Sequence, residues 1–258
     1  MKKNYEFKGG DRLCGIYEDY HHIMMLNELK YGKGAYKLSW AGTENSGLSF
    51  GGNQMDIAHN AYGRAIFLKI IQNATHSDGS KILSDSEIRS IEKICSQQDK
   101  IIAIPVKKAF SNMVPKIDEA LSSGYGKKLI HDAYVNEILS KGCIIEMFID
   151  SLKEGPGKNF ARSDIGKIHL FDYSNQYGLS ARGPLYKFLN GEKAVLKSGA
   201  VLGPITKQDF NLEDFKNDFL FHLKYYKNNP ENVIRRLDNI TEYVNNECSK
   251  HTPRVCQE

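Results

Sequence analysis

The chain has 258 residues, enough to bury one sizeable hydrophobic core. Its hydrophobic content of 41% and charged content of 26% are typical of a folded soluble protein and exclude an intrinsically disordered chain. A formal net charge of +4, from 35 basic and 31 acidic residues, is too small to indicate a nucleic-acid-binding protein.

The N-terminal segment, residues 1–10, begins with two lysines but has no apolar run after them. A Sec signal peptide needs such a run, so the sequence predicts synthesis in the cytoplasm without a Sec signal. Nowhere does the chain contain about 18 consecutive apolar residues, so no membrane span is expected.

The first predicted helix runs from Asp11 to about Lys30, because apolar residues recur there at spacings of three and four. Gly32 and Gly34 end it. The following stretch, residues 35–50, alternates irregularly and contains the only tryptophan, Trp40. Its pattern predicts short hairpin-like strands and loops.

A second strongly patterned helix is predicted from the N-cap Asp56 to about Asn73. The first third of the chain therefore reads as a helix, a small β element and a helix. After it, Ser84 and Glu87 have the spacing of a capping box, which indicates the start of another short helix.

The rest of the chain is predicted to be largely helical. Further helices are expected at residues 102–112, 116–122, 127–140 and 142–153, with an interruption at 154–181 and two long amphipathic helices at 213–227 and 230–246. The prediction is a mainly α (α+β) fold and a single domain, 1–258, in which 154–258 form an extended helical C-terminal lobe.

The segment from Ser46 to Asp56 is the strongest functional signal, because it gathers glycines, hydroxyls, an amide and a carboxylate ahead of a helix. Its part Phe50-Gly51-Gly52-Asn53-Gln54-Met55-Asp56 resembles the Phe-Gly-x-x-Gln-x-Asp motif of goose-type lysozymes and lytic transglycosylases. The preceding turn is similar to that of pesticin-like phage lysozymes, with Ser49 where those enzymes usually have threonine. The resemblance covers roughly residues 20 to 75 and implies a lysozyme-like fold that cleaves the glycan of peptidoglycan.

The resemblance also implies a general acid. Glycosidic cleavage needs an acid for the departing oxygen and a second group that places water or stabilises positive charge. In the resembled families the acid is a glutamate at the end of the helix before the motif, which is Glu28 here. Burial against Met24, Met25 and Trp40 would raise its pKa, as a general acid requires. The alternative is an exposed helix-end glutamate without a catalytic role.

Two carboxylates compete for the second role. Asp56 would place water on the opposite face of the sugar, cap the following helix, or do both. Glu44 is the rival, since goose-type enzymes carry an acidic residue before the motif, although a solvated loop glutamate is the simpler interpretation. Ser49 is expected to orient the water.

Sugar-contacting side chains are expected in two places. Four lie in or near the turn: Gln54, Gly51, Asn53 and Trp40. Two more, Tyr173 and Asn175, lie in a segment that loosely resembles the Tyr-Asn-x-Gly segment of lytic transglycosylases, because tyrosine rings stack on sugars and amides bind hydroxyls. Hydrogen bonds that only stabilise turns are the alternative explanation.

Cysteine usage leaves the redox environment open. The five cysteines, Cys14, Cys95, Cys143, Cys248 and Cys256, are odd in number and cannot all be paired. A disulfide between Cys248 and Cys256 and two free thiols are both compatible with the sequence. No metal-ligand spacing and no phosphate or dinucleotide motif is present, so no metal and no cofactor are expected.

The predicted function is a muramidase that cleaves the β-1,4 bond between N-acetylmuramic acid and N-acetylglucosamine, as an endolysin or secreted antibacterial effector. Its partners would be peptidoglycan glycan strands and an immunity or delivery protein, and it would reach the wall by export or lysis. One alternative is a lytic transglycosylase. Another is a lysozyme-fold module that binds glycan or protein without catalysis, since a fold can outlast its activity.

Overall fold

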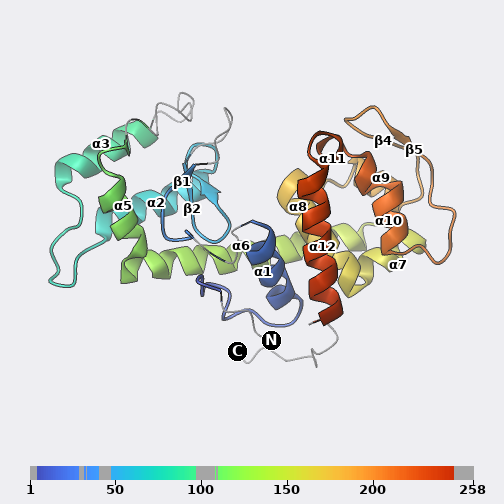
Figure 1. Ribbon diagram of the computed structural model, residues 1–258, viewed down its shortest axis with the longest axis horizontal. Helices are drawn as coiled ribbons and strands as arrows, with labels where there is room; N and C mark the ends of the chain where they lie inside the picture. The colour runs from blue at the N-terminus through green and yellow to red at the C-terminus, as the bar shows by residue number, and fades with distance from the viewer. Residues whose placement is uncertain are drawn as a thin grey trace. The chain divides into compact units, whose positions relative to one another are not determined.

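A computed structural model describes residues 5–28, 32, 34–40, 48–96, 108 and 110–246. Within these residues the chain is mainly helical with two small antiparallel sheets, which confirms the mainly α prediction (Figure 1). The chain divides into two compact units. The helical unit comprises the described residues of Leu13–Asn27 and Ile138–Glu258, and the sheet unit those of Lys2–Arg12 and Glu28–Glu137.

The sheet unit is organised around a three-stranded antiparallel sheet in the order β1-β2-β3. Its strands are β1 (Ser39–Trp40), β2 (Leu48–Phe50) and β3 (Met55–Asp56). All three residues of β2 are buried, so the central strand anchors the sheet in the core. The short strands expected at residues 35–50 are confirmed for the part of that stretch that the structure describes.

Helices make up most of the remaining sheet unit. They are α2 (Ala61–Asn73), α3 (Asp85–Cys95), α5 (Val114–Ser122) and the first half of α6 (Gly124–Asp150). The fully buried ring of Phe67 lies 5.8 Å from Phe50 and 6.1 Å from Phe110, between ring centroids. The predicted capping box at Ser84 and Glu87 is confirmed at the start of α3.

The helical unit consists of α1 (Ile16–Asn27), the second half of α6 and the elements after it. These are α7 (Pro156–Arg162), α8 (Asp164–Tyr177), α9 (Pro184–Leu189), β4 (Ala194–Val195), β5 (Val201–Leu202), α10 (Leu212–Asp218), η2 (Leu220–His222), α11 (Lys224–Asn228) and α12 (Pro230–Asn246). Helix α1 packs against α8 and α12 (Figure 1). The Tyr20 ring stacks on Phe171 at a centroid distance of 4.4 Å.

Several predicted boundaries were wrong for identifiable reasons. The first helix begins at Ile16 rather than Asp11, because Gly15 adopts a left-handed backbone with φ +57°. The helices expected at 127–140 and 142–153 are one helix, α6, in which Gly142 lies against the ring of Tyr17. A Cβ at Gly142 would lie 2.3 Å from that ring, so this glycine permits close packing and does not break the helix.

The second half of the chain required further corrections. The segment expected to interrupt the helices at 154–181 contains α7 and α8, and Ser163 caps α8. The long helix expected at 213–227 is divided into α10, η2 and α11. The final helix, 230–246, has the predicted bounds. Most of the helix expected at 102–112 lies outside the described residues, and the single-domain expectation stays a prediction.

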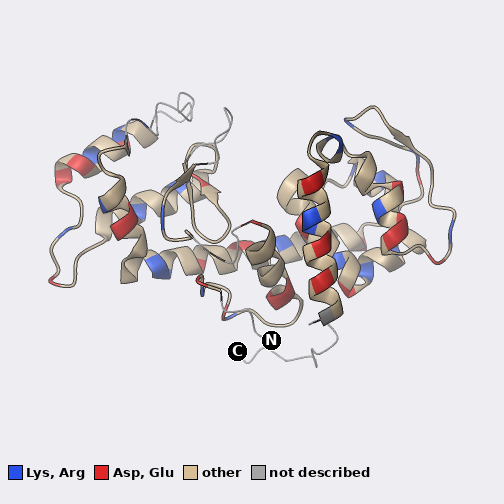
Figure 2. Cartoon of the chain, in the orientation of Figure 1, with Lys and Arg blue, Asp and Glu red and all other residues tan. Residues whose placement is uncertain are grey.

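Charges of both signs are interspersed along the individual helices. Figure 2 shows Lys or Arg beside Asp or Glu on both α3 and α12, with no block of one sign on either. This arrangement suits solvated helix faces. Among the described residues, no helix combines the length and the apolar character that crossing a bilayer requires.

Candidate functional site

A row of polar residues crosses the three-stranded sheet. Ser49 on β2 lies opposite both Ser39 on β1 and Asp56 on β3. Residues directly opposite one another in antiparallel strands project from the same face, so these three side chains share one face. Ser49 is buried, whereas Ser39 and Asp56 are half-buried. The row brings a hydroxyl and a carboxylate together near the surface.

The turn between β2 and β3 is strained at Gln54. With φ +52°, Gln54 is the only non-glycine residue with positive φ in the described part of the chain. Its backbone N–H donates to Gly51 O at 3.2 Å, its side-chain Nε2 donates to the same oxygen at 3.1 Å, and Ser39 Oγ donates to its Oε1. These bonds hold a conformation that glutamine disfavours, and such strain concentrates at functional sites.

Packing within the unit explains the two glycines of the turn. Gly51 has φ +82° and is buried, and its N–H donates to Ala35 O at 2.8 Å. A Cβ on Gly52 would lie 2.5 Å from the Phe7 ring and 2.8 Å from the Tyr134 ring. The glycines therefore allow the turn to close against aromatic side chains, which is the alternative that the sequence left open beside sugar contact.

A carboxylate that sequence reasoning missed reaches the same turn. Glu137, half-buried on α6, accepts a hydrogen bond from Asn53 Nδ2. Asn53 Oδ1 is buried and has no hydrogen-bond partner in the structure. Burial raises the pKa of Tyr134 well above its ordinary value, and the negative charge of Glu137 raises it further. The sequence carries no local signal for this contact, because 84 residues separate Glu137 from Asn53.

Asp56 caps a turn and not helix α2. Its Oδ1 accepts hydrogen bonds from the backbone N–H groups of Ala58 at 2.7 Å and His59 at 3.0 Å. Helix α2 starts five residues later at Ala61, and its N-cap is Asn60, which accepts from the N–H of Gly63 at 2.8 Å. The predicted N-cap was therefore wrong, because pairing with Ser49 extends the strand to Asp56.

Glu28 occupies the turn position directly after α1 and belongs to the same unit as Ser49, Gln54 and Asp56. The helix does end where the acid was expected. Its side chain is exposed, so the expected burial against Met24, Met25 and Trp40 is wrong. Helix α1 ends before the glutamate, and the buried face of the helix stops at Asn27.

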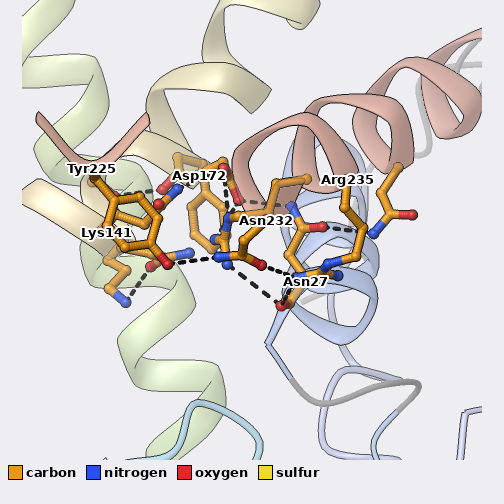
Figure 3. A network of polar contacts seen from close by, with 12 residues as sticks. Asn27, Lys141, Asp172, Tyr225, Asn232 and Arg235 are labelled. Carbon is orange, nitrogen blue, oxygen red and sulfur yellow. Dashed lines mark hydrogen bonds and ion pairs between the residues drawn. The ribbon is translucent and has the colours of Figure 1, made fainter. Parts of the chain in front are cut away.

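A buried polar network in the helical unit fixes the residue before Glu28 (Figure 3). Asn27 Nδ2 donates to Asp172 Oδ1 at 2.8 Å, and its Oδ1 accepts from Asn239 Nδ2 at 2.9 Å. Arg236 pairs with both carboxylate oxygens of Asp172, at 2.7 and 3.3 Å. Arg235 and Arg236 also donate to the backbone oxygen of Asn27, at 3.4 Å each. The end of α1 is therefore held in one position.

The remaining predicted residues lie elsewhere. Glu44 lies outside the described residues. Trp40 is half-buried on β1, opposite Leu48. Tyr173 and Asn175 lie on α8 in the helical unit, so they do not share a unit with the turn. Asn175 Oδ1 accepts a hydrogen bond from Lys141 Nζ at 2.6 Å, whereas Tyr173 lines a separate pocket.

Cysteine and metal chemistry add little to the site. Cys14 is disulfide-bonded, Cys95 and Cys143 are free, and Cys248 and Cys256 lie outside the described residues. The described residues include no group of three or more His, Cys, Asp or Glu side chains that could hold a metal ion. The polar side chains of the turn and its neighbouring strands carry hydroxyl, amide and carboxylate groups.

Comparisons with protein families, with curated proteins and with solved structures find no match for this chain.

Proposed function

We propose that the chain is a muramidase that hydrolyses the β-1,4 bond between N-acetylmuramic acid and N-acetylglucosamine in peptidoglycan. The observation that carries the proposal is the pairing of Ser49 and Asp56 on adjacent strands. The turn that joins these strands is strained at Gln54, and helix α1, which precedes the sheet, ends directly before Glu28. This order of helix, small sheet and helix is what the resemblance to lysozyme-like enzymes implies.

In this proposal Glu28 protonates the departing glycosidic oxygen. Asp56, fixed by two backbone N–H groups, orients a water or stabilises positive charge at the sugar, and Ser49 helps to hold the water. Glu137 is a positioning residue, because its bond to Asn53 orients an amide that can contact an N-acetyl group. The hydrogen bonds of Gln54 to Gly51 and Ser39 hold the strained turn in a single geometry.

The disulfide at Cys14 supports action outside the cytoplasm, because disulfides persist mainly in oxidising compartments. Peptidoglycan lies there. An endolysin or a secreted antibacterial effector fits this location.

A module that binds glycan without cleaving it is the second candidate. The exposure of Glu28 favours it, because the general acid of a glycosidase usually lies in a buried, apolar environment. In that case the turn and the sheet would bind the sugar through hydroxyls and amides without cleaving it.

The test is digestion of purified peptidoglycan by the full chain, with soluble products identified by mass spectrometry. Muropeptides with reducing ends support the proposal. Products with 1,6-anhydro ends would instead identify a lytic transglycosylase. If nothing is released but the protein sediments with insoluble peptidoglycan, the binding module replaces the enzyme, and an absence of both results contradicts both.

A further inference from the structure

A separate pocket in the helical unit carries features of a ligand-binding site that the proposed hydrolysis does not use. Its volume is about 440 Å³, within the range of about 300–1,000 Å³ in which small-molecule sites fall. The end of α8, the loop before α9, the turn after β4 and the start of α11 surround it. The pocket therefore lies within one unit, on elements of fixed secondary structure.

The wall of the pocket is predominantly apolar. Leucines from four segments line it, and three of them are buried in the core of the unit. The leucines are Leu179, Leu185, Leu196 and Leu223. Three tyrosine rings complete the wall. Tyr177 lies 4.8 Å from Tyr173 and 6.4 Å from Tyr225, between ring centroids. An apolar ligand of several carbon atoms would bury its surface here.

The uncharged polar groups are too few for a sugar ring. Beyond the tyrosine hydroxyls, the uncharged polar side chains among the described lining residues are Gln176, Ser180 and Asn228. The Tyr225 hydroxyl already accepts a hydrogen bond from Asn232 at 2.7 Å. A sugar presents hydroxyls around its whole edge, and each one desolvated without a partner disfavours binding. An alkyl chain has no such requirement.

Both charged side chains among the described lining residues are lysines. Lys197, in the turn after β4, and Lys224, at the first position of α11, are both exposed lining residues. The described residues that line the pocket include no aspartate or glutamate. Burial raises the pKa of Tyr173 to about 12 and also raises the pKa of Tyr177, so these phenols stay neutral. A cation would be repelled, whereas a single negative charge at the pocket rim would be attracted.

We propose that this pocket binds an anionic amphiphile, an alkyl chain with a carboxylate head, such as a medium-chain fatty acid. The alkyl chain lies among the leucines and tyrosine rings, and the carboxylate lies near Lys197 and Lys224 at the rim. A site for a fatty acid in the helical unit does not depend on glycan cleavage by the sheet unit.

The test is calorimetric titration of the full chain with decanoate below its micelle concentration, alongside decanol, decyltrimethylammonium and N-acetylmuramic acid. We expect decanoate to bind with a micromolar Kd, decanol at least about tenfold more weakly, and the cation and the sugar acid not at all. Binding of N-acetylmuramic acid in preference to decanoate, or no binding of decanoate, would overturn the proposal.

Variants locate the binding. Ser180→Trp, at the lining, should abolish the decanoate signal, whereas Ala181→Trp, exposed and one residue outside the lining, should preserve it. Lys197→Gln combined with Lys224→Gln should weaken decanoate about three- to tenfold and leave decanol unchanged, with exposed Lys193→Gln as the control. Far-UV circular dichroism verifies that each variant is folded, and decanoate binding unchanged by both changes at the lining would contradict the assignment.

Discussion

The polar turn of the sheet unit and the polar network of the helical unit use the same residue types in opposite ways. In the network, Asp172 and Arg236 are buried and pair through two hydrogen bonds, and both polar side-chain atoms of Asn27 are bonded. In the turn, Asp56 is half-buried, Gln54 is strained and Asn53 Oδ1 has no partner. The network has the features of a structural element, and the turn has those of a site.

This difference shows how to distinguish polar clusters that stabilise the fold from polar clusters that can bind a ligand. A satisfied, buried cluster stabilises one arrangement of helices, and its residues gain little from touching a ligand. A cluster that retains unsatisfied or half-exposed groups can exchange water for substrate. The same distinction predicts different responses to mutation in the two regions.

The largest effect is expected from Arg236→Ala in the network. Removing one partner leaves the Asp172 carboxylate buried without its charge partner, which should lower the free energy of unfolding by about 3–5 kcal/mol. Urea denaturation followed by circular dichroism measures it. The double change Arg236→Met with Asp172→Leu should recover part of the loss, because neither charge then remains, while Asn27 Nδ2 loses its acceptor. A loss below about 1 kcal/mol for the single change would show that the network is not structural.

Acid should weaken the helical unit through His169. This histidine is fully buried, its Nε2 has no hydrogen-bond partner, and burial lowers its pKa from 6.5 to about 4. The folded state therefore keeps His169 neutral, while the unfolded chain takes up a proton below pH 6.5. Stability should fall by about 1 kcal/mol per pH unit between pH 6.5 and 4.

The contribution of His169 is measured by comparing the pH dependence of the urea midpoint in wild type and in variants. Urea midpoints recorded from pH 7 to 4.5 should fall less steeply in His169→Leu than in wild type, and the exposed His59→Gln should behave like wild type. Equal slopes in all three proteins would show that His169 does not control the acid response.

Neighbouring residues in the sequence predicted some helix boundaries correctly. Packing between residues far apart in the sequence determined other helices, which were missed. The capping box of Ser84 and Glu87 and the Pro230 start of α12 depend on a few neighbouring residues, and both were predicted. Helix α8 was missed because its glycine, asparagine and tyrosine content is typical of loops, yet its buried face, including Leu170 and Phe171, packs in the core.

The sequence predicted only those residues of the candidate site that lie close together in the chain. Ser49, Gln54 and Asp56 lie within one short hairpin, β2-turn-β3, and the motif predicted them together. Glu137 reaches Asn53 across 84 residues of sequence, and no local pattern reports that contact. Asp56 was misplaced as a helix cap because the sequence does not show that Asn60 takes that position.

Strain at Gln54 offers a smaller and cleaner test of the turn. Gln54→Gly and Gln54→Ala lose the same side-chain bonds, but only glycine accepts φ +52° without strain. The glycine variant should therefore be about 1 kcal/mol more stable than the alanine variant. At Ala65 in helix α2 alanine should be the more stable residue, and Ala65→Gly should lower the free energy of unfolding by about 1 kcal/mol. A glycine variant at Gln54 no more stable than the alanine variant would exclude stored strain.

The smallest effect on stability is expected at Asp56. In Asp56→Asn the side-chain oxygen still accepts from Ala58 and His59, so the free energy of unfolding should change by less than about 1 kcal/mol. The exposed Asp78→Asn, which alters a similar turn bonded to Ser80, is the matched control. Only the change at Asp56 should lower glycan cleavage. Equal cleavage by both variants would remove Asp56 from the chemistry.

The most direct test of the proposed function compares muropeptide release from purified peptidoglycan by wild type, Glu28→Gln and Glu6→Gln. Glu6 is an exposed glutamate of the same unit and serves as the control. We expect Glu6→Gln to release reducing-end muropeptides at the wild-type rate and Glu28→Gln to release them at least about a hundredfold more slowly, since a general acid contributes about that much. Equal release by wild type and Glu28→Gln would contradict the assignment of Glu28 as the acid.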